Sequence, residues 1–213
     1  MAGQLRRIGL RSLTAIVLTH PQRDHIGGAA SVIRRLRVAT VLDPELAVRG
    51  PEYVDALAAA RERGVPIVEI RAGDTFRMGR LRLDVLWPDD AGLPGEDPNL
   101  NATVIHARFG ETDALLTADA ESDVTRRLSL GPVEILKVAH HGSEDPGLPD
   151  LLRLLRPRLA VISVGEGNDY DHPRPETIGA LDAVPGLTTA RTDLDGRIVI
   201  ESDGRAVTLR SER

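Results

Sequence analysis

Short apolar runs that end at a histidine are the feature of this sequence that most restricts its fold. Residues 14–19 have the pattern of a strand that is buried on both faces, and His20 follows directly. Four more histidines lie at or just beyond the ends of predicted strands, namely His25, His140, His141 and His172. Open α/β sheets bind their ligands at the carboxyl ends of strands. The sequence therefore predicts an α/β fold with a functional site at strand ends.

The other patterns give the order of the elements along the chain. Helices are predicted over 29–36 and 51–63, and a polar loop rich in proline and glycine over 88–99. Strands are predicted over 38–42, 65–70, 74–78, 81–86, 103–109, 113–117, 135–138 and 160–164, with a final hairpin of 197–200 and 206–209. A chain of 213 residues with this alternation predicts one domain over 1–213.

Composition restricts the chemistry further. The chain is 41% hydrophobic and 28% charged, which is ordinary for a soluble globular protein. It contains no cysteine, so imidazole and oxygen ligands must hold any metal. No apolar run reaches about 18 residues, and this predicts no transmembrane helix. The net charge of −5 argues against a general polyanion binder but is compatible with a nuclease that uses a local patch and a metal. Lys137 is the only lysine, which we attribute to coding bias towards arginine.

The segment from His20 to Gly28 places several ligand types in one loop. Asp24 and His25 are adjacent, and Gly27 with Gly28 permits a tight entry into the following helix. The alternative that Asp24 only caps this helix explains neither histidine. The segment therefore predicts a metal site. His106, the sixth histidine, lies inside a strand pattern and is predicted to be an ordinary strand residue.

Several segments together resemble one known family. They are Leu18-Thr-His-Pro-Gln-Arg-Asp-His-Ile-Gly-Gly28, Asn101-Ala-Thr103, Leu115-Leu-Thr-Ala-Asp-Ala-Glu121, Ile135-Leu-Lys-Val-Ala-His-His-Gly-Ser143, Ser163-Val-Gly165, Tyr170-Asp-His-Pro173 and Arg191-Thr-Asp-Leu-Asp-Gly196. In this order they resemble the metallo-β-lactamase superfamily. Within it, they are most similar to the hydrolase-like C-terminal domain of ComEC-type DNA-uptake (competence) proteins.

The resemblance implies an α/β fold of the αββα sandwich type and a centre for divalent metal, zinc or manganese, with one or two ions. The implied metal ligands are His20, Asp24, His25, Asp119 and His172. Asp24, His25 and His172 would hold one ion, and Asp119 would bridge towards a second ion at His20. Asp24, His140 and His141 are the implied catalytic residues. Asn101, Thr103 and Ser143 are the implied substrate-binding residues.

The sequence departs from the family pattern in three places. Gln22 stands where a second histidine is usual, and Asn101 stands where another histidine ligand is expected. Both changes remove ligands from one metal position, which favours a single well-held ion or a second that is hard and loosely bound. Only 13 residues precede the strand at residue 14, so the first strands of the sandwich are expected to be missing or reduced, as in a fragment of a longer protein.

The resemblance implies a phosphodiesterase or nuclease that uses a metal-activated water on DNA during competence-related uptake. A hydrolase of small esters or lactones is an alternative, because one fold serves many substrates. A degenerate interaction module is a third reading, favoured by Gln22 and Asn101. The expected partners are DNA and the membrane channel part of a competence protein. A free-standing chain is expected in the cytoplasm, and a domain of a competence protein on the extracytoplasmic face of the membrane.

Overall fold

The computed structural model describes residues 1–90, 92–95 and 97–212. The predicted loop over 88–99 includes residues 91 and 96, which lie outside the described residues. The chain divides into two compact units. Unit 1 consists of Met1–Asp74 and Trp87–Thr103, and unit 2 of Thr75–Leu86 and Val104–Arg213. The single domain over 1–213 stays a prediction.

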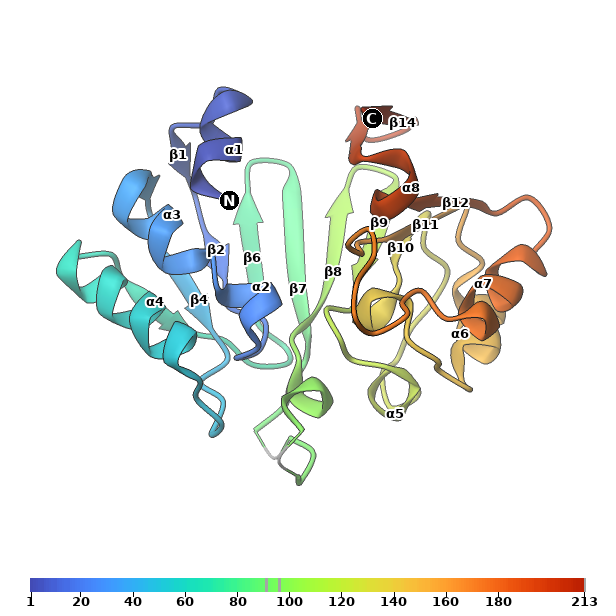
Figure 1. Cartoon of the computed structure of the whole chain (residues 1–213), viewed down its shortest axis with the longest axis horizontal. Coiled ribbons are helices and arrows are strands. Elements are labelled where there is room, and N and C mark those ends of the chain that lie inside the picture. The colour runs from blue at the N-terminus through green and yellow to red at the C-terminus, as the bar shows by residue number, and fades with distance from the viewer. Residues whose placement is uncertain (91, 96, 213) are drawn as a thin grey trace. The chain divides into compact units, whose positions relative to one another are not determined.

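Unit 1 contains two small parallel sheets and several helices (Figure 1). One sheet has the strand order β2-β4-β5, and the other pairs β1 with β3. The elements are α1 (Ala2–Arg7), β1 (Ser12–Leu13), β2 (Ile16–Val17), α2 (Arg23–Ile26), α3 (Ala29–Arg35), β3 (Arg37–Val38), β4 (Val41–Asp43), α4 (Pro51–Glu62), β5 (Ile67–Glu69) and the 3-10 helix η1 (Pro98–Asn101).

The core of unit 1 forms where α3 and α4 pack beside the strands. Ile33 of α3 and Val41 of β4 are both fully buried. In α4, Ala56, Ala59 and Ala60 are also fully buried, because small side chains allow close approach of the helix. The helix begins with a proline at its first turn, where a missing N–H costs nothing. Leu18, which follows β2 and lies two residues before His20, belongs to the same buried cluster, so the end of β2 is part of the core of unit 1.

Unit 2 is built on a seven-stranded sheet of order β12-β11-β10-β9-β8-β7-β6. The four strands from β9 to β12 are parallel, whereas β8 pairs antiparallel with β9 and β6 antiparallel with β7. The elements are β6 (Thr75–Met78), β7 (Leu81–Trp87), β8 (Val104–Phe109), β9 (Thr112–Leu116), α5 (Ser122–Thr125), β10 (Ile135–Lys137), the 3-10 segment η2 (Ala139–Gly142), α6 (Leu148–Leu155), β11 (Leu159–Ile162), α7 (Pro175–Asp182), β12 (Thr188–Arg191), α8 (Thr192–Asp195), β13 (Arg197–Ser202) and β14 (Val207–Glu212).

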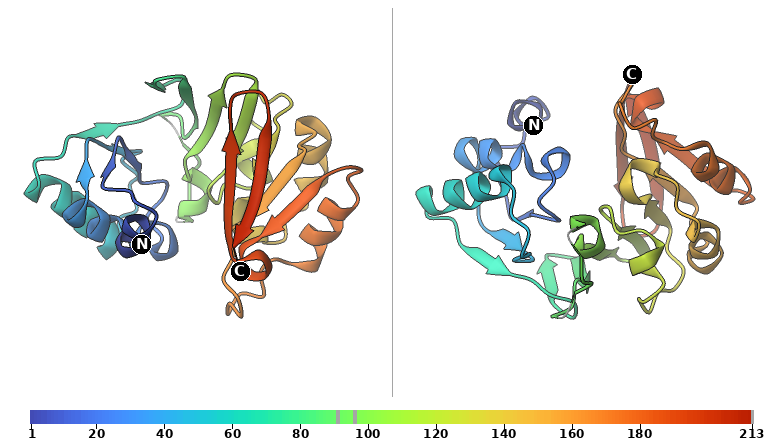
Figure 2. Two further views of the ribbon diagram at one scale, coloured as in Figure 1. Left: turned by 90° about the horizontal axis from the view of Figure 1, so that it is seen from above. Right: turned by 60° about the horizontal axis from the view of Figure 1, so that its bottom comes forward.

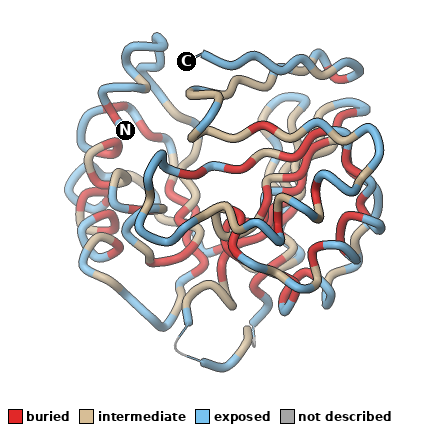
Figure 3. The backbone as a smooth tube through the Cα atoms, turned by 45° about the vertical axis from the view of Figure 1, so that its right-hand side comes forward, coloured by how far each residue is buried: buried red, intermediate tan, exposed pale blue. Residues whose placement is uncertain are grey.

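The final hairpin, β13 with β14, forms a ribbon that crosses the strands of the larger sheet (Figure 2). Ile198, Ile200 and Val207 of this ribbon pack against a buried cluster that includes Ile135 and Leu159. Buried backbone follows adjacent strands of the sheet, and the ribbon stays more exposed (Figure 3). The hairpin predicted from the sequence is confirmed.

Some elements differ from the prediction. The single strand predicted over 38–42 is two strands, because β3 pairs with β1 while β4 pairs with β2. Residues before 14 form α1 and β1, which the apolar pattern did not reveal. The ranges of α6, α7 and β12 were also not predicted. In the part of the chain that is described, no helix combines the length and the apolar character needed to cross a bilayer.

Asp84 joins three strands of the larger sheet and offers a stability test. Its carboxylate accepts hydrogen bonds from Thr75 (2.6 Å), Arg82 (2.7 Å) and Arg108. Burial alone would raise the pKa of Asp84, but these hydrogen bonds outweigh it and hold the pKa well below its usual value. A depressed pKa in the folded state stabilises the protein above about pH 4, and this stabilisation is lost as the pH falls further.

We expect Asp84→Asn to lower the free energy of unfolding by about 2 to 3 kcal/mol at pH 7, and by less at pH 3, since the lost bonds are charge-assisted. Urea unfolding at both pH values measures this. Asp150→Asn is the control, because the Asp150 side chain is 76% exposed and pairs only with Arg153 of the same helix among the contacts resolved. If Asp84→Asn and Asp150→Asn lowered the free energy of unfolding equally, the Asp84 carboxylate would not have the stabilising role described here.

Candidate metal centre

The carboxyl ends of adjacent parallel strands in unit 2 place acidic and imidazole groups together. Asp119 follows β9, and the pair His140-His141 follows β10. The Asp119 side chain is fully buried, and its two oxygens have different neighbours. Oδ2 lies 3.6 Å from Nε2 of His141, and Oδ1 lies 3.6 Å from Nζ of Lys137. The predicted convergence of Asp119 with His141 is therefore present within this unit.

The backbone at the histidine pair is strained. His140 has φ 47° and His141 has φ 55°, and Gly142 follows with φ 83°. A non-glycine residue in this left-handed region costs about 1 to 2 kcal/mol, and such residues cluster at functional sites. A Cβ atom on Gly142 would lie 2.6 Å from Cβ of Pro173, so this turn packs directly on the segment that carries His172. This backbone conformation places two successive histidine side chains on one tight turn.

Hydrogen bonds to the δ nitrogens fix both rings of the pair. Nδ1 of His141 lies 2.7 Å from the carbonyl oxygen of Ser163, which can only accept, so Nδ1 donates. Nδ1 of His140 lies 2.8 Å from the Glu121 carboxylate, which also receives a bond from the Ser143 hydroxyl. In neutral rings the ε nitrogens then carry the lone pairs. Histidines that bind metals usually have this arrangement, with the second nitrogen bonded to a carbonyl or carboxylate.

His172 joins this cluster from the loop after β11. Its ring centroid lies 5.6 Å from that of His140. Nδ1 of His172 is buried and has no hydrogen-bond partner among the described residues. Burial, followed by the charges of His140 and His141, lowers the pKa of His172 and favours the neutral ring. A neutral imidazole with a lone pair is the form that binds a metal, so His172 fits the predicted ligand role.

Unit 1 contains a cluster of its own. His20 follows β2 and is fully buried, and its ring centroid lies 4.1 Å from that of His25. Oδ2 of Asp24 lies 3.7 Å from Nε2 of His25. Asp24 lies inside the first turn of α2, whose N-cap residue is Gln22. The capping alternative for Asp24 is therefore not what the structure shows, and the three predicted ligands of this segment gather within unit 1.

The predicted substrate-binding residues have structural contacts of their own. The side-chain amide of Asn101 accepts from the N–H of Leu93 and donates to its carbonyl, each at 2.8 Å. Both the backbone N–H and the hydroxyl of Thr103 donate to the carbonyl of Thr19, which ties this residue to the end of β2. Ser143 supports Glu121, as described above. Their role towards a substrate stays a prediction.

Sequence reasoning gave no role to three groups of the unit 2 cluster: the Glu121 side chain, the Ser163 carbonyl and the Lys137 ammonium. Glu121 belongs to one of the segments that resemble the family, but its contact with His140 joins residues 19 positions apart and forms only when their two loops fold together. The Ser163 carbonyl carries no side-chain signal at all. The signal for Lys137 was its being the only lysine in the chain.

A test of the His140 assignment uses Glu121→Gln. A charge-assisted hydrogen bond contributes about 1.5 to 3 kcal/mol, so its loss should shift His140 substantially away from the Nδ1–H tautomer. Nitrogen-15 NMR of the imidazole rings measures this shift. Glu144→Gln is the matched control, since Glu144 is exposed beside the same turn and has no bond to His140 among those resolved. Unchanged His140 signals in Glu121→Gln would contradict the assignment.

The donor set fits a divalent metal. Imidazole nitrogens and carboxylate oxygens suit zinc, manganese or iron, and no thiolate is present. The observation that supports this fit is the buried δ nitrogen of His172 beside the fixed rings of His140 and His141.

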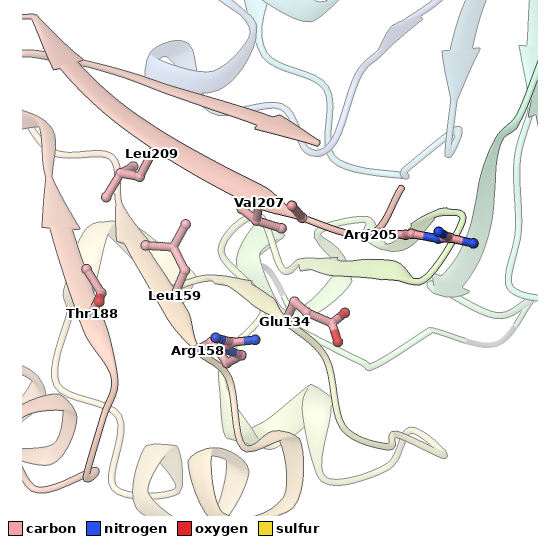
Figure 4. Close-up of a pocket in the computed structure, with 8 residues that line it drawn as sticks. Glu134, Arg158, Leu159, Thr188, Arg205, Val207 and Leu209 are labelled. Atoms are coloured by element: carbon pink, nitrogen blue, oxygen red, sulfur yellow. The ribbon is translucent and has the colours of Figure 1, made fainter. Parts of the chain in front are cut away.

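A separate cavity of about 440 Å³ lies at the opposite ends of the same parallel strands (Figure 4). Leu159 faces Val207 and Leu209 of the ribbon there, and Glu134 and Arg158 contribute charge. None of the predicted site residues lines this cavity, so it is distinct from the candidate metal centre.

Comparisons with known proteins show the family of this chain. Residues 2–166 match the metallo-beta-lactamase superfamily. The chain is 32% identical over 194 residues to ComE operon protein 3 of Bacillus subtilis, covering 89% of this chain and 25% of that protein. It is 28% identical over 171 residues to Recombination protein 2 of Haemophilus influenzae, covering 79% and 20% respectively. The chain thus spans a quarter or less of the length of these curated relatives.

A solved structure gives the same fold. CmlA, a diiron β-hydroxylase from Streptomyces venezuelae, superimposes with a TM-score of 0.60 at 18% identity, covering 85% of this chain and 44% of that one. At this identity the likeness concerns the fold alone. The α/β fold of metallo-β-lactamase type that the sequence predicted is confirmed, as is the resemblance to competence proteins. The chain belongs to the metallo-beta-lactamase superfamily.

Proposed function

We propose that this chain is a metal-dependent phosphodiesterase that acts on DNA. The observation that carries the proposal is the contact of His141 with the buried Asp119, because His141 is also fixed through Nδ1 in the manner of a metal ligand. Burial of a carboxylate is costly, so a fully buried Asp119 beside an imidazole whose other nitrogen is anchored supports a metal-binding role.

The proposed metal ligands are those implied by the family: His20, Asp24, His25, Asp119 and His172. His141 is proposed as a catalytic residue beside Asp119, as a further ligand or a proton donor. A bound divalent ion supplies a Lewis acid and lowers the pKa of water towards neutrality. Which of zinc and manganese is bound, and whether one or two ions are held, belongs to the proposal.

The chain's own residues then handle the protons and the substrate. His140 is held by Glu121 at Nδ1, and its proposed role is to exchange a proton with a leaving oxygen through the ring. Asp24 keeps an exposed carboxylate, 57% accessible, that can accept a proton from water. Ser143 keeps Glu121 in place through its hydroxyl. Asn101 and Thr103 are proposed to contact the substrate.

The proposal that DNA is the substrate is supported by the names of similar proteins. Similar chains carry the names ComE operon protein 3, Recombination protein 2 and Competence protein ComA. Because this chain matches only a part of each, partners in a membrane channel and a place outside the cytoplasmic membrane are part of the proposal.

The test is hydrolysis by the purified chain with Mn²⁺ or Zn²⁺. We expect cleavage of single- or double-stranded DNA and of bis(p-nitrophenyl) phosphate, and a loss of at least about 100-fold in His141→Ala, which is about 2.7 kcal/mol of barrier. His106→Ala is the matched control, because His106 pairs with Asp113 inside the sheet at 3.3 Å. Cleavage of a lactone or small ester but not of DNA would select that alternative. No hydrolysis of any substrate, by a folded and metal-loaded chain, would favour the interaction module.

A further inference from the structure

Lys137 occupies a special place in the charge distribution of this protein. It is the last residue of β10 and the only lysine among 27 basic residues. Its Nζ lies 3.6 Å from Oδ1 of Asp119 and donates to the carbonyl of Ala118. The side chain is 20% exposed, whereas that of Asp119 is fully buried. A cation is thus held against the carboxylate at the centre of the unit 2 cluster.

The contact makes the two oxygens of Asp119 unequal. Oδ2 faces the ε nitrogen of His141, the atom that carries a lone pair when the ring is neutral. Oδ1 faces an ammonium. Charges interact more strongly where water is excluded, so the Lys137 charge acts more strongly on this buried carboxylate than it would on an exposed one. Oδ2 therefore lies beside an imidazole that can bind a metal, and Oδ1 lies beside a positive charge.

The chain uses arginine almost everywhere else, which makes a lysine here informative. A guanidinium is a broad planar fork, whereas an ammonium is a compact point charge on a flexible stem. Here the ammonium donates to the Ala118 carbonyl and also approaches Oδ1 of the next residue. The backbone N–H of His140 donates to the same carbonyl at 3.2 Å, so Lys137 also joins the Asp119 turn to the histidine turn.

We propose that Lys137 is a positioning residue that limits this centre to one tightly held divalent ion. A second divalent ion bound through Oδ1 would approach a cation that already lies 3.6 Å from that oxygen, and like charges repel. Gln22 and Asn101 act in the same direction, because they replace the usual ligands of one metal position. The inference rests on the proposed metal-dependent function and specifies how many ions the site holds.

The test is a metal titration of the folded chain and its variants with Mn²⁺. Calorimetry counts the ions, and electron paramagnetic resonance distinguishes isolated Mn²⁺ from a coupled pair. Lys137→Gln is the central variant, since its amide can still donate to the Ala118 carbonyl but carries no charge. Lys137→Arg keeps the charge. Arg158→Met removes one charge at the opposite end of the neighbouring strand and controls for net charge.

We expect one tightly bound ion in the parent chain, in Lys137→Arg and in Arg158→Met. In Lys137→Gln a second ion should bind at least about tenfold more tightly than in the parent, which corresponds to 1.4 kcal/mol, with the signal of a coupled pair. A lysine that only supports the turn would change thermal stability and leave the ion count unaltered. Thermal unfolding of each variant confirms that the fold is intact.

Two results would overturn the inference while leaving the proposed function in place. One is a parent chain that binds two ions with equal affinity, and the other is a folded Lys137→Gln that binds its ions as the parent does. A parent chain that binds no divalent ion would instead overturn the proposed function itself.

Discussion

Asp119→Asn is expected to lower kcat/KM for phosphodiester hydrolysis by at least about 1,000-fold, or about 4 kcal/mol of transition-state stabilisation. Asparagine has nearly the same shape but lacks the charge. The carboxylate is fully buried, with His141 at one oxygen and Lys137 at the other, so its neutralisation leaves the Lys137 ammonium beside an uncharged partner. Breaking a buried pair costs about 3 to 5 kcal/mol, so the same change should also reduce stability. Steady-state kinetics and urea unfolding measure the two effects.

Asp123→Asn is the control for this prediction. Asp123 lies four residues further along, its side chain is 70% exposed, and it pairs with Arg126 at 2.8 Å. An exposed pair of this kind contributes at most about 1 kcal/mol, so activity should be unchanged and stability nearly so. Full activity in folded Asp119→Asn would contradict a role for this carboxylate in the metal centre.

Removing the metal is expected to abolish hydrolysis and to lower the thermal stability of the chain. A ligand that binds only the folded state stabilises it by about 2.7 kcal/mol when its free concentration is 100 times its dissociation constant. For a chain of this size each kcal/mol shifts Tm by about 2 to 4 °C, so a chelator should lower Tm by about 5 to 10 °C. Calorimetric melting with and without chelator, followed by return of Mn²⁺ or Zn²⁺, measures the shift.

The variant His141→Ala separates this effect from nonspecific action of the chelator. If His141 helps to hold the ion, the melting temperature of the variant should respond much less to chelator or added metal. A shift of equal size in parent and variant would argue against His141 as part of the centre. No shift in the parent at saturating metal would argue against any stabilising metal site.

Much of the fold followed from apolar patterning and turn residues. The helix at Pro51, the hairpin around Gly110 and the terminal hairpin were all predicted, because local period and turn chemistry determine them. The short strands β1 and β3 were not, since two residues carry no measurable period. β1 and β3 pair because α3, between them, brings the chain back beside β1, and such a long-range contact leaves no local sequence pattern.

The candidate site shows the same division. Histidines and aspartates at strand ends were visible in the sequence because the position of a residue after a strand fixes the sheet edge at which it lies. The partners that orient them were not visible. The Ser163 carbonyl selects the tautomer of His141 from 22 residues away, and Glu121 fixes His140 from 19 away. The sequence indicates which side chains could bind a metal. The tautomer and orientation of each ring depend on contacts that form only in the folded protein.

The central proposal is that His20, Asp24, His25, Asp119 and His172 hold a divalent metal. The most direct measurement is the metal content of the folded chain after loading with Mn²⁺ or Zn²⁺ and dialysis, compared among His20→Ala, His25→Ala, His172→Ala and the control His106→Ala. We predict at least one retained ion in the parent and in His106→Ala, and a marked loss in the other three. A folded parent that retains no ion, or ligand variants that retain as much as His106→Ala, would contradict the claim.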